Sequence, residues 1–72
     1  MKYQPLSDVQ KKKGADTFLR TGIGCFERED YEMARVFLGL AHYLYKGAGD
    51  KWNTGISLPW YETACEKVGI AP

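Results

Sequence analysis

The sequence predicts an all-α fold, in which three antiparallel helices pack against one another. Three observations predict this class. Apolar residues recur at spacings of three and four, turn residues separate these stretches, and no segment alternates with a period of two. A chain of 72 residues forms one domain, so we expect a single helical unit over residues 1–72, with helices over about 7–26, 31–46 and 58–68.

The first helix is predicted to begin at Ser7, because Ser7 and Gln10 have the spacing of a capping box. Pro5 favours an extended segment before it. One face of the helix is apolar and consists of Ala15, Phe18, Leu19, Gly22, Ile23 and Phe26. The polar run over residues 27–30 ends this helix.

The second helix is predicted to be the middle member of the layer. Asp30 is a suitable N-cap for it. One apolar face holds Ala34, Phe37, Leu38, Ala41 and either Leu44 or Tyr45, and another holds Met33, Val36, Leu40 and Tyr43. A narrow polar stripe remains, made of Glu32, Arg35, Gly39, His42 and Lys46. A helix that is apolar around most of its circumference is buried on two sides, so we expect a neighbour on each flank.

The third helix is predicted to follow a loop over residues 47–55 that contains Trp52. Pro59 suits the first turn of a helix, and Gly69 followed by Ile70 has the form of a Schellman stop. A glycine inside a helix costs about 1 kcal/mol relative to alanine. We therefore expect the helical glycines and alanines to let large side chains pack closely over a neighbouring backbone; these small residues are Gly22, Ala34, Gly39, Ala41 and Ala64.

The segment 40–69 resembles the Sel-like repeat, a branch of the tetratricopeptide superfamily. The residues that carry the resemblance are Gly47, Gly49, Trp60, Tyr61, Ala64 and Cys65, whereas Ala41, Leu44, Ser57 and one extra residue before Gly69 depart from the family pattern. Residues 18–41 also resemble a single tetratricopeptide unit. The chain then holds about one and a half repeats, and the resemblance implies that the three helices form a solenoid-like fragment and that the protein is a binding scaffold rather than a catalyst.

A repeat fragment of this length leaves its outer faces without neighbours. We expect the chain either to self-associate as a two-fold homodimer or to dock onto a larger protein as an adaptor or inhibitor, encoded by a bacterium or a phage. The candidate contact residues are Arg35, His42, Tyr45 and Trp52, because the core pattern leaves them available and Tyr, Trp and Arg are enriched in binding hot spots. Trp52 has a second interpretation, in which it folds back over the core.

The sequence gives less support to other functional classes. His42, Cys25 and Cys65 lack the spacing of a metal site and an adjacent oriented base, so we expect no enzyme, no cofactor and no metal. The net charge is +1, which gives no general attraction to nucleic acid. The alternative function is that of an accessory factor of a nucleic-acid complex that uses the Lys11–Lys13 cluster. The apolar stretches are too short to cross a membrane, and we expect a cytoplasmic protein.

Overall fold

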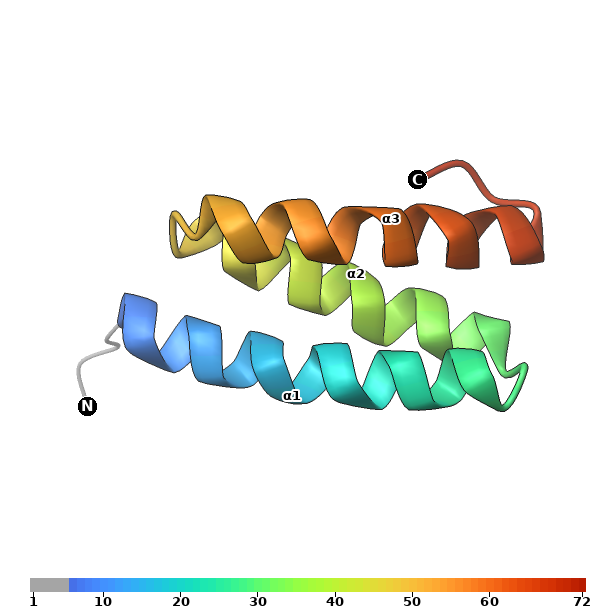
Figure 1. Cartoon of the computed structure of the whole chain (residues 1–72), viewed down its shortest axis with the longest axis horizontal. Coiled ribbons are helices and arrows are strands. Elements are labelled where there is room, and N and C mark those ends of the chain that lie inside the picture. The colour runs from blue at the N-terminus through green and yellow to red at the C-terminus, as the bar shows by residue number, and fades with distance from the viewer. Residues whose placement is uncertain (1–5) are drawn as a thin grey trace, which may run out of the picture.

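The computed structural model describes residues 6–72, and this part of the chain consists of three helices without a strand. α1 spans Asp8–Glu27, α2 spans Tyr31–Gly47 and α3 spans Lys51–Val68. α2 packs against α1 and against α3, while α1 and α3 make few contacts with each other (Figure 1). The predicted all-α fold and the central position of the second helix are confirmed. The extended segment expected around Pro5 lies outside the described residues.

Local signals in the sequence place most of the helix ends. The Gln10 N–H donates to Ser7 Oγ at 3.2 Å and the Ser7 N–H donates to Gln10 Oε1 at 2.9 Å, which completes the predicted capping box. Asp30 caps α2 by accepting from the Met33 N–H. Gly69 has a φ of 74°, and the Ile70 N–H donates to the Cys65 carbonyl at 2.9 Å, as a Schellman stop requires.

The predicted start of the third helix is wrong, because α3 begins at Lys51 and includes most of the expected loop. Asp50 caps it: its carboxylate accepts from both the backbone N–H and the side-chain amide of Asn53, at 3.1 Å and 2.7 Å. Pro59 therefore lies inside the helix and not in its first turn. Proline removes one backbone hydrogen bond to the carbonyl four residues earlier, here that of Gly55, and exposure of Gly55 lets water replace the lost donor.

All three helices end in the same way, with one residue in the left-handed conformation. The φ values are 64° at Glu29, 73° at Gly49 and 74° at Gly69. Among residues 6–72, Glu29 is the single non-glycine residue with positive φ. The Asp30 N–H still donates to the Cys25 carbonyl at 2.9 Å, so the turn forms normally despite the steric cost of a side chain in this conformation.

Replacing Glu29 by glycine is expected to raise the free energy of unfolding by about 0.5–1 kcal/mol, because relief of the left-handed strain exceeds the added entropy of the unfolded chain. Urea denaturation measures the change. Glu27→Gly is the matched control, since Glu27 is exposed in the last turn of α1 and the same substitution there is expected to destabilise by a similar amount. Equal destabilisation by both substitutions would contradict the role of the turn.

The core is formed by small side chains that let large ones approach a backbone. One cluster contains Cys25, Ala34, Leu38 and Ala64, and a second contains Ala15, Ala41 and Tyr45. A methyl group added at Gly22 would lie 2.7 Å from Leu38 Cγ, and one added at Gly39 would lie 2.9 Å from Tyr61 Cε1. Gly22 thus admits Leu38 between α1 and α2, and Gly39 admits Tyr61 between α2 and α3, as the sequence predicts.

We expect Gly22→Ala to lower the free energy of unfolding by about 1–3 kcal/mol, although alanine is the better helix former, because fully buried Leu38 has no room to move. Gly55→Ala is the matched control: Gly55 also lies inside a helix, its added methyl group meets no packing neighbour within 4 Å, and the substitution is expected to stabilise by up to about 1 kcal/mol. Thermal and urea denaturation measure both. A stabilised Gly22→Ala protein would contradict the packing.

The second apolar face predicted for α2 is not the face that α3 covers. The buried residues of α2 form a single line, Ala34, Leu38, Ala41 and Tyr45. The residues on the opposite side of the helix remain exposed, with relative exposures of 42% at Met33, 40% at Val36, 43% at Leu40 and 76% at Tyr43. α3 instead lies over part of the predicted polar stripe, at Gly39 and His42. The outward-facing line of α2 is called the α2 stripe below.

Candidate functional site

The structure separates the four predicted contact residues. Trp52 lies in the first turn of α3 with 77% of its surface exposed, so the core interpretation of this residue is wrong. Tyr45 is 1% exposed and lies in the α1–α2 core. Arg35 and His42 are half-buried along α3. These side chains do not form one continuous surface.

Tyr45 belongs to the core, in agreement with its predicted place on the apolar face of α2. Its hydroxyl donates a hydrogen bond to Asp16 Oδ1 on α1. Burial and, second, the bond to Asp16 raise the pKa of the Tyr45 phenol well above its ordinary value of 10.0. The phenol therefore stays neutral and joins α1 to α2, and its side chain is not presented to a partner.

His42 and Arg35 belong to the contact between α2 and α3. His42 Nδ1 lies 3.3 Å from Oγ of Ser57, a fully buried residue whose hydroxyl also donates to the Thr54 carbonyl at 3.1 Å. The imidazole stacks on the Tyr61 ring, with centroids 6.3 Å apart. Arg35 Nη2 lies 3.6 Å from Glu32 Oε2. His42 accordingly contacts the buried hydroxyl of Ser57 on α3, whereas Arg35 pairs within α2 and its buried Nε has no hydrogen-bond partner among the described residues.

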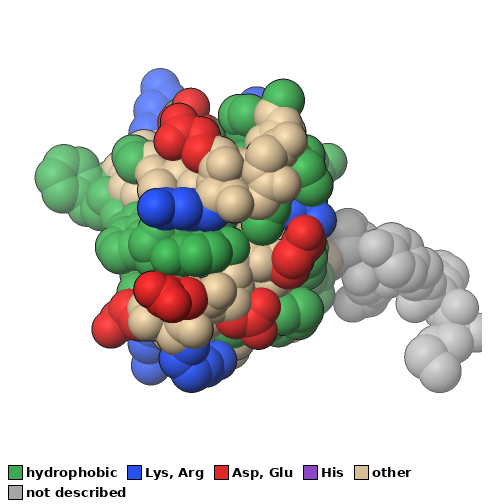
Figure 2. Space-filling view, turned by 90° about the vertical axis from the view of Figure 1, so that its right-hand side faces the viewer, with side chains coloured by type: hydrophobic (Ala, Val, Ile, Leu, Met, Phe, Trp, Pro, Cys, Tyr) green, Lys and Arg blue, Asp and Glu red, His purple; other side chains and the backbone are tan. Residues whose placement is uncertain are grey.

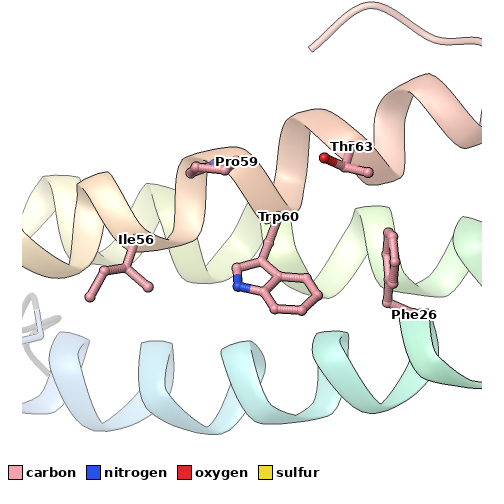
Figure 3. A pocket seen from close by; sticks show the side chains of 5 residues that line it. All are labelled: Phe26, Ile56, Pro59, Trp60 and Thr63. Atoms are coloured by element: carbon pink, nitrogen blue, oxygen red, sulfur yellow. The ribbon is translucent and has the colours of Figure 1, made fainter.

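The bundle has two open apolar surfaces, and none of the four predicted contact residues belongs to either of them. The first is the α2 stripe. The second is a groove of about 410 Å³ between α1 and α3, lined by Phe26, Ile56, Pro59, Trp60 and Thr63 and called the α1–α3 groove below (Figure 3). It exists because α1 and α3 make few contacts with each other. Trp60 points from α3 toward α1, and its ring meets Phe26 edge to face at 5.5 Å.

A hydrophobic patch at the end of the bundle where α2 begins and α3 ends has charged groups on two sides (Figure 2). Lys67 Nζ lies 5.6 Å from the centroid of the Tyr31 ring. Figure 2 views the molecule from this end and shows hydrophobic side chains gathered on its left, with basic groups directly above them and acidic groups below. An apolar centre with a charged rim is the usual layout of a protein-binding surface.

The lysine cluster is partly engaged within the fold. Lys11 Nζ lies 3.5 Å from the Gly47 carbonyl at the end of α2, and Lys12 Nζ lies 3.9 Å from Asp50 Oδ2 at the N-cap of α3. Lys13 is exposed. These contacts show that the start of α1 lies beside the turn between α2 and α3. The Asp50 carboxylate offsets part of the positive charge at Lys12, whereas the Gly47 carbonyl leaves the charge of Lys11 unchanged.

Residues 6–72 contain no grouping of His, Cys, Asp and Glu side chains suited to a metal ion. Cys25 and Cys65 are free and buried on different helices. No described helix combines the length and apolar character needed to cross a membrane.

Neither family models nor curated proteins nor solved structures provide a match for this chain. The resemblance of residues 40–69 to the Sel-like repeat stays a prediction. In the structure this segment covers the second half of α2, the turn and all of α3.

The two tryptophans are expected to respond differently to substitution. Trp52→Ala should change the free energy of unfolding by less than about 0.5 kcal/mol, because the indole is 77% exposed. Trp60→Ala should cost about 2 kcal/mol, because half-buried Trp60 packs on the main core cluster and on Phe26. Denaturation followed by circular dichroism compares the two variants. Strong destabilisation by Trp52→Ala would contradict its exposed position.

Proposed function

We propose that this protein is a small interaction module that acts by stoichiometric binding to a larger protein, as an adaptor or inhibitor. One observation carries the proposal: the bundle keeps large apolar side chains exposed on two separate surfaces, the α2 stripe and the α1–α3 groove. Exposed apolar patches with a polar rim are typical of protein-binding sites. Trp52 and Tyr43 are 77% and 76% exposed and are side chains of the types that contribute most to such interfaces.

The thinness of the bundle supports the same proposal. The fully buried residues are mainly small, and Tyr45 and Leu38 are the largest of them. Each Å² of apolar surface removed from water contributes about 25 cal/mol, so the apolar surface still exposed is available to stabilise a complex. The alternative role in a nucleic-acid complex gains no support, because two of the three clustered lysines contact other parts of the same chain.

A photo-crosslinking amino acid placed at Ile56, in the α1–α3 groove, tests the proposal in the cells that make the protein. We expect a covalent adduct with one larger protein at one chain per partner, because an apolar ligand of the groove lies against Ile56. Mass spectrometry of the adduct measures the partner mass and the stoichiometry.

The control places the same amino acid at Thr21, which is exposed on α1 and lies outside the groove. It should give no such adduct. Equal labelling from Thr21 and Ile56, or no larger protein labelled from Ile56 in cells where the chain is abundant, would contradict the proposed function.

A further inference from the structure

We propose that two copies of this chain pair through the α2 stripe, with the two α2 helices antiparallel and related by a two-fold axis. The inference deepens the proposed function and rests on it, since it names the occupant of one of the two apolar surfaces. The α1–α3 groove lies outside this pairing and stays open for the larger partner.

The spacing of the α2 stripe is that of a coiled-coil seam. Met33, Val36, Leu40 and Tyr43 follow one another at intervals of three, four and three, the a and d positions of a heptad. All four side chains are at least 40% exposed on the outward side of α2. The stripe covers about 15 Å of helix at 1.5 Å per residue. A second helix can therefore lie along it without displacing α1 or α3.

The stripe is symmetric in sequence, and this symmetry favours the antiparallel arrangement. Met33 and Tyr43 lie five residues on either side of position 38, while Val36 and Leu40 lie two residues on either side. Reversing one helix about this point places Met33 opposite Tyr43 and Val36 opposite Leu40, and both pairs occur twice. A two-fold interface requires this kind of self-complementary surface.

Charge complementarity selects the same arrangement. Glu32 and Lys46 lie seven residues on either side of Gly39, at the heptad positions that flank the stripe along its α3 side. In an antiparallel pair these flanking positions face their equivalents, so Glu32 of each copy meets Lys46 of the other. A parallel pair would place Glu32 against Phe37 and leave the charges unmatched. In the single chain the Glu32 side chain is 68% exposed and its ion pair is with Arg35.

The surface beside Tyr43 has room for the side chain that the pairing brings to it. A hollow of about 370 Å³ is lined by His42, Tyr43, Lys46 and Gly47. The antiparallel register places Met33 of the second copy at this end of α2. Methionine is unbranched and flexible, which suits it to fill an irregular hollow.

Sedimentation equilibrium over protein concentrations from roughly 1 μM to 1 mM tests the pairing. We expect a reversible monomer–dimer equilibrium for the natural chain and at least tenfold weaker association for Leu40→Glu, because the substitution buries a charge in the seam. Ile56→Glu is the matched control, since Leu40 and Ile56 are 43% and 40% exposed and receive the same new charge. It should leave the dimer intact. Circular dichroism verifies that both variants keep their helices.

Charge reversal tests the orientation. Glu32→Lys and Lys46→Glu should each weaken the dimer about tenfold, because each places like charges together twice, and the double variant should recover most of the loss. Cysteines introduced separately as Val36→Cys and Leu40→Cys should form a disulfide when the two proteins are mixed and oxidised, and Val36→Cys alone should form little. The native cysteines are buried, with exposures of 4% and 0%, so they do not compete.

A chain that stays monomeric at millimolar concentration, or a dimer that Ile56→Glu dissociates and Leu40→Glu does not, would overturn the inference. Failure of the proposed function looks different. A dimer with these properties whose Ile56 labels no larger protein contradicts the adaptor or inhibitor role alone, and a monomer whose Ile56 labels one contradicts the pairing alone.

Discussion

The structure depends on how closely the central helix approaches its neighbours. Leu38 reaches the α1 backbone at Gly22, and Tyr61 reaches the α2 backbone at Gly39. An interface between helices this close has room for few large side chains, so the fully buried small residues Ala34, Ala41 and Ala64 fill the rest of it. The outward line of α2 cannot share in these contacts, because a helix turns by 100° per residue and its buried line points the other way. The same approach that forms the core therefore leaves the α2 stripe exposed.

Local chemistry made most of the fold predictable. Ser7 and Asp30 accept hydrogen bonds from N–H groups in the first turn of a helix, and Gly69 takes the left-handed conformation that ends one. These signals are local, so they can be predicted from the sequence without tertiary context. The predicted start of α3 is wrong because proline is most frequent in the first turn of a helix, and Pro59 therefore indicated a start near residue 58. Pro59 instead lies inside α3, four residues after the exposed Gly55, and Asp50 caps the helix about two turns before the predicted start.

The exposed surface was less predictable than the fold, because it depends on which side of α2 the neighbours occupy. Both apolar lines of α2 have helical spacing, and this spacing alone does not say which one is covered. Partial signals were present. Ser57 and His42 are polar residues whose hydrogen bond brings the polar stripe under α3. Phe37 and Leu44 widen the apolar face that contains the buried line, whereas the α2 stripe keeps the narrow seam pattern of two apolar positions per heptad.

The scarcity of large buried side chains also links stability to association. Folding a residue costs about 1–2 kcal/mol of backbone entropy, and a core of mostly small residues repays this less fully than a core of large ones. Any partner that binds the folded chain and not the unfolded chain adds to its stability in proportion to the logarithm of its concentration. Pairing through the α2 stripe would remove from water the apolar surface that α1 and α3 leave exposed on the central helix. The helix that organises the monomer would then also be the centre of the dimer, and the groove on the other side of the bundle would remain open for a different protein.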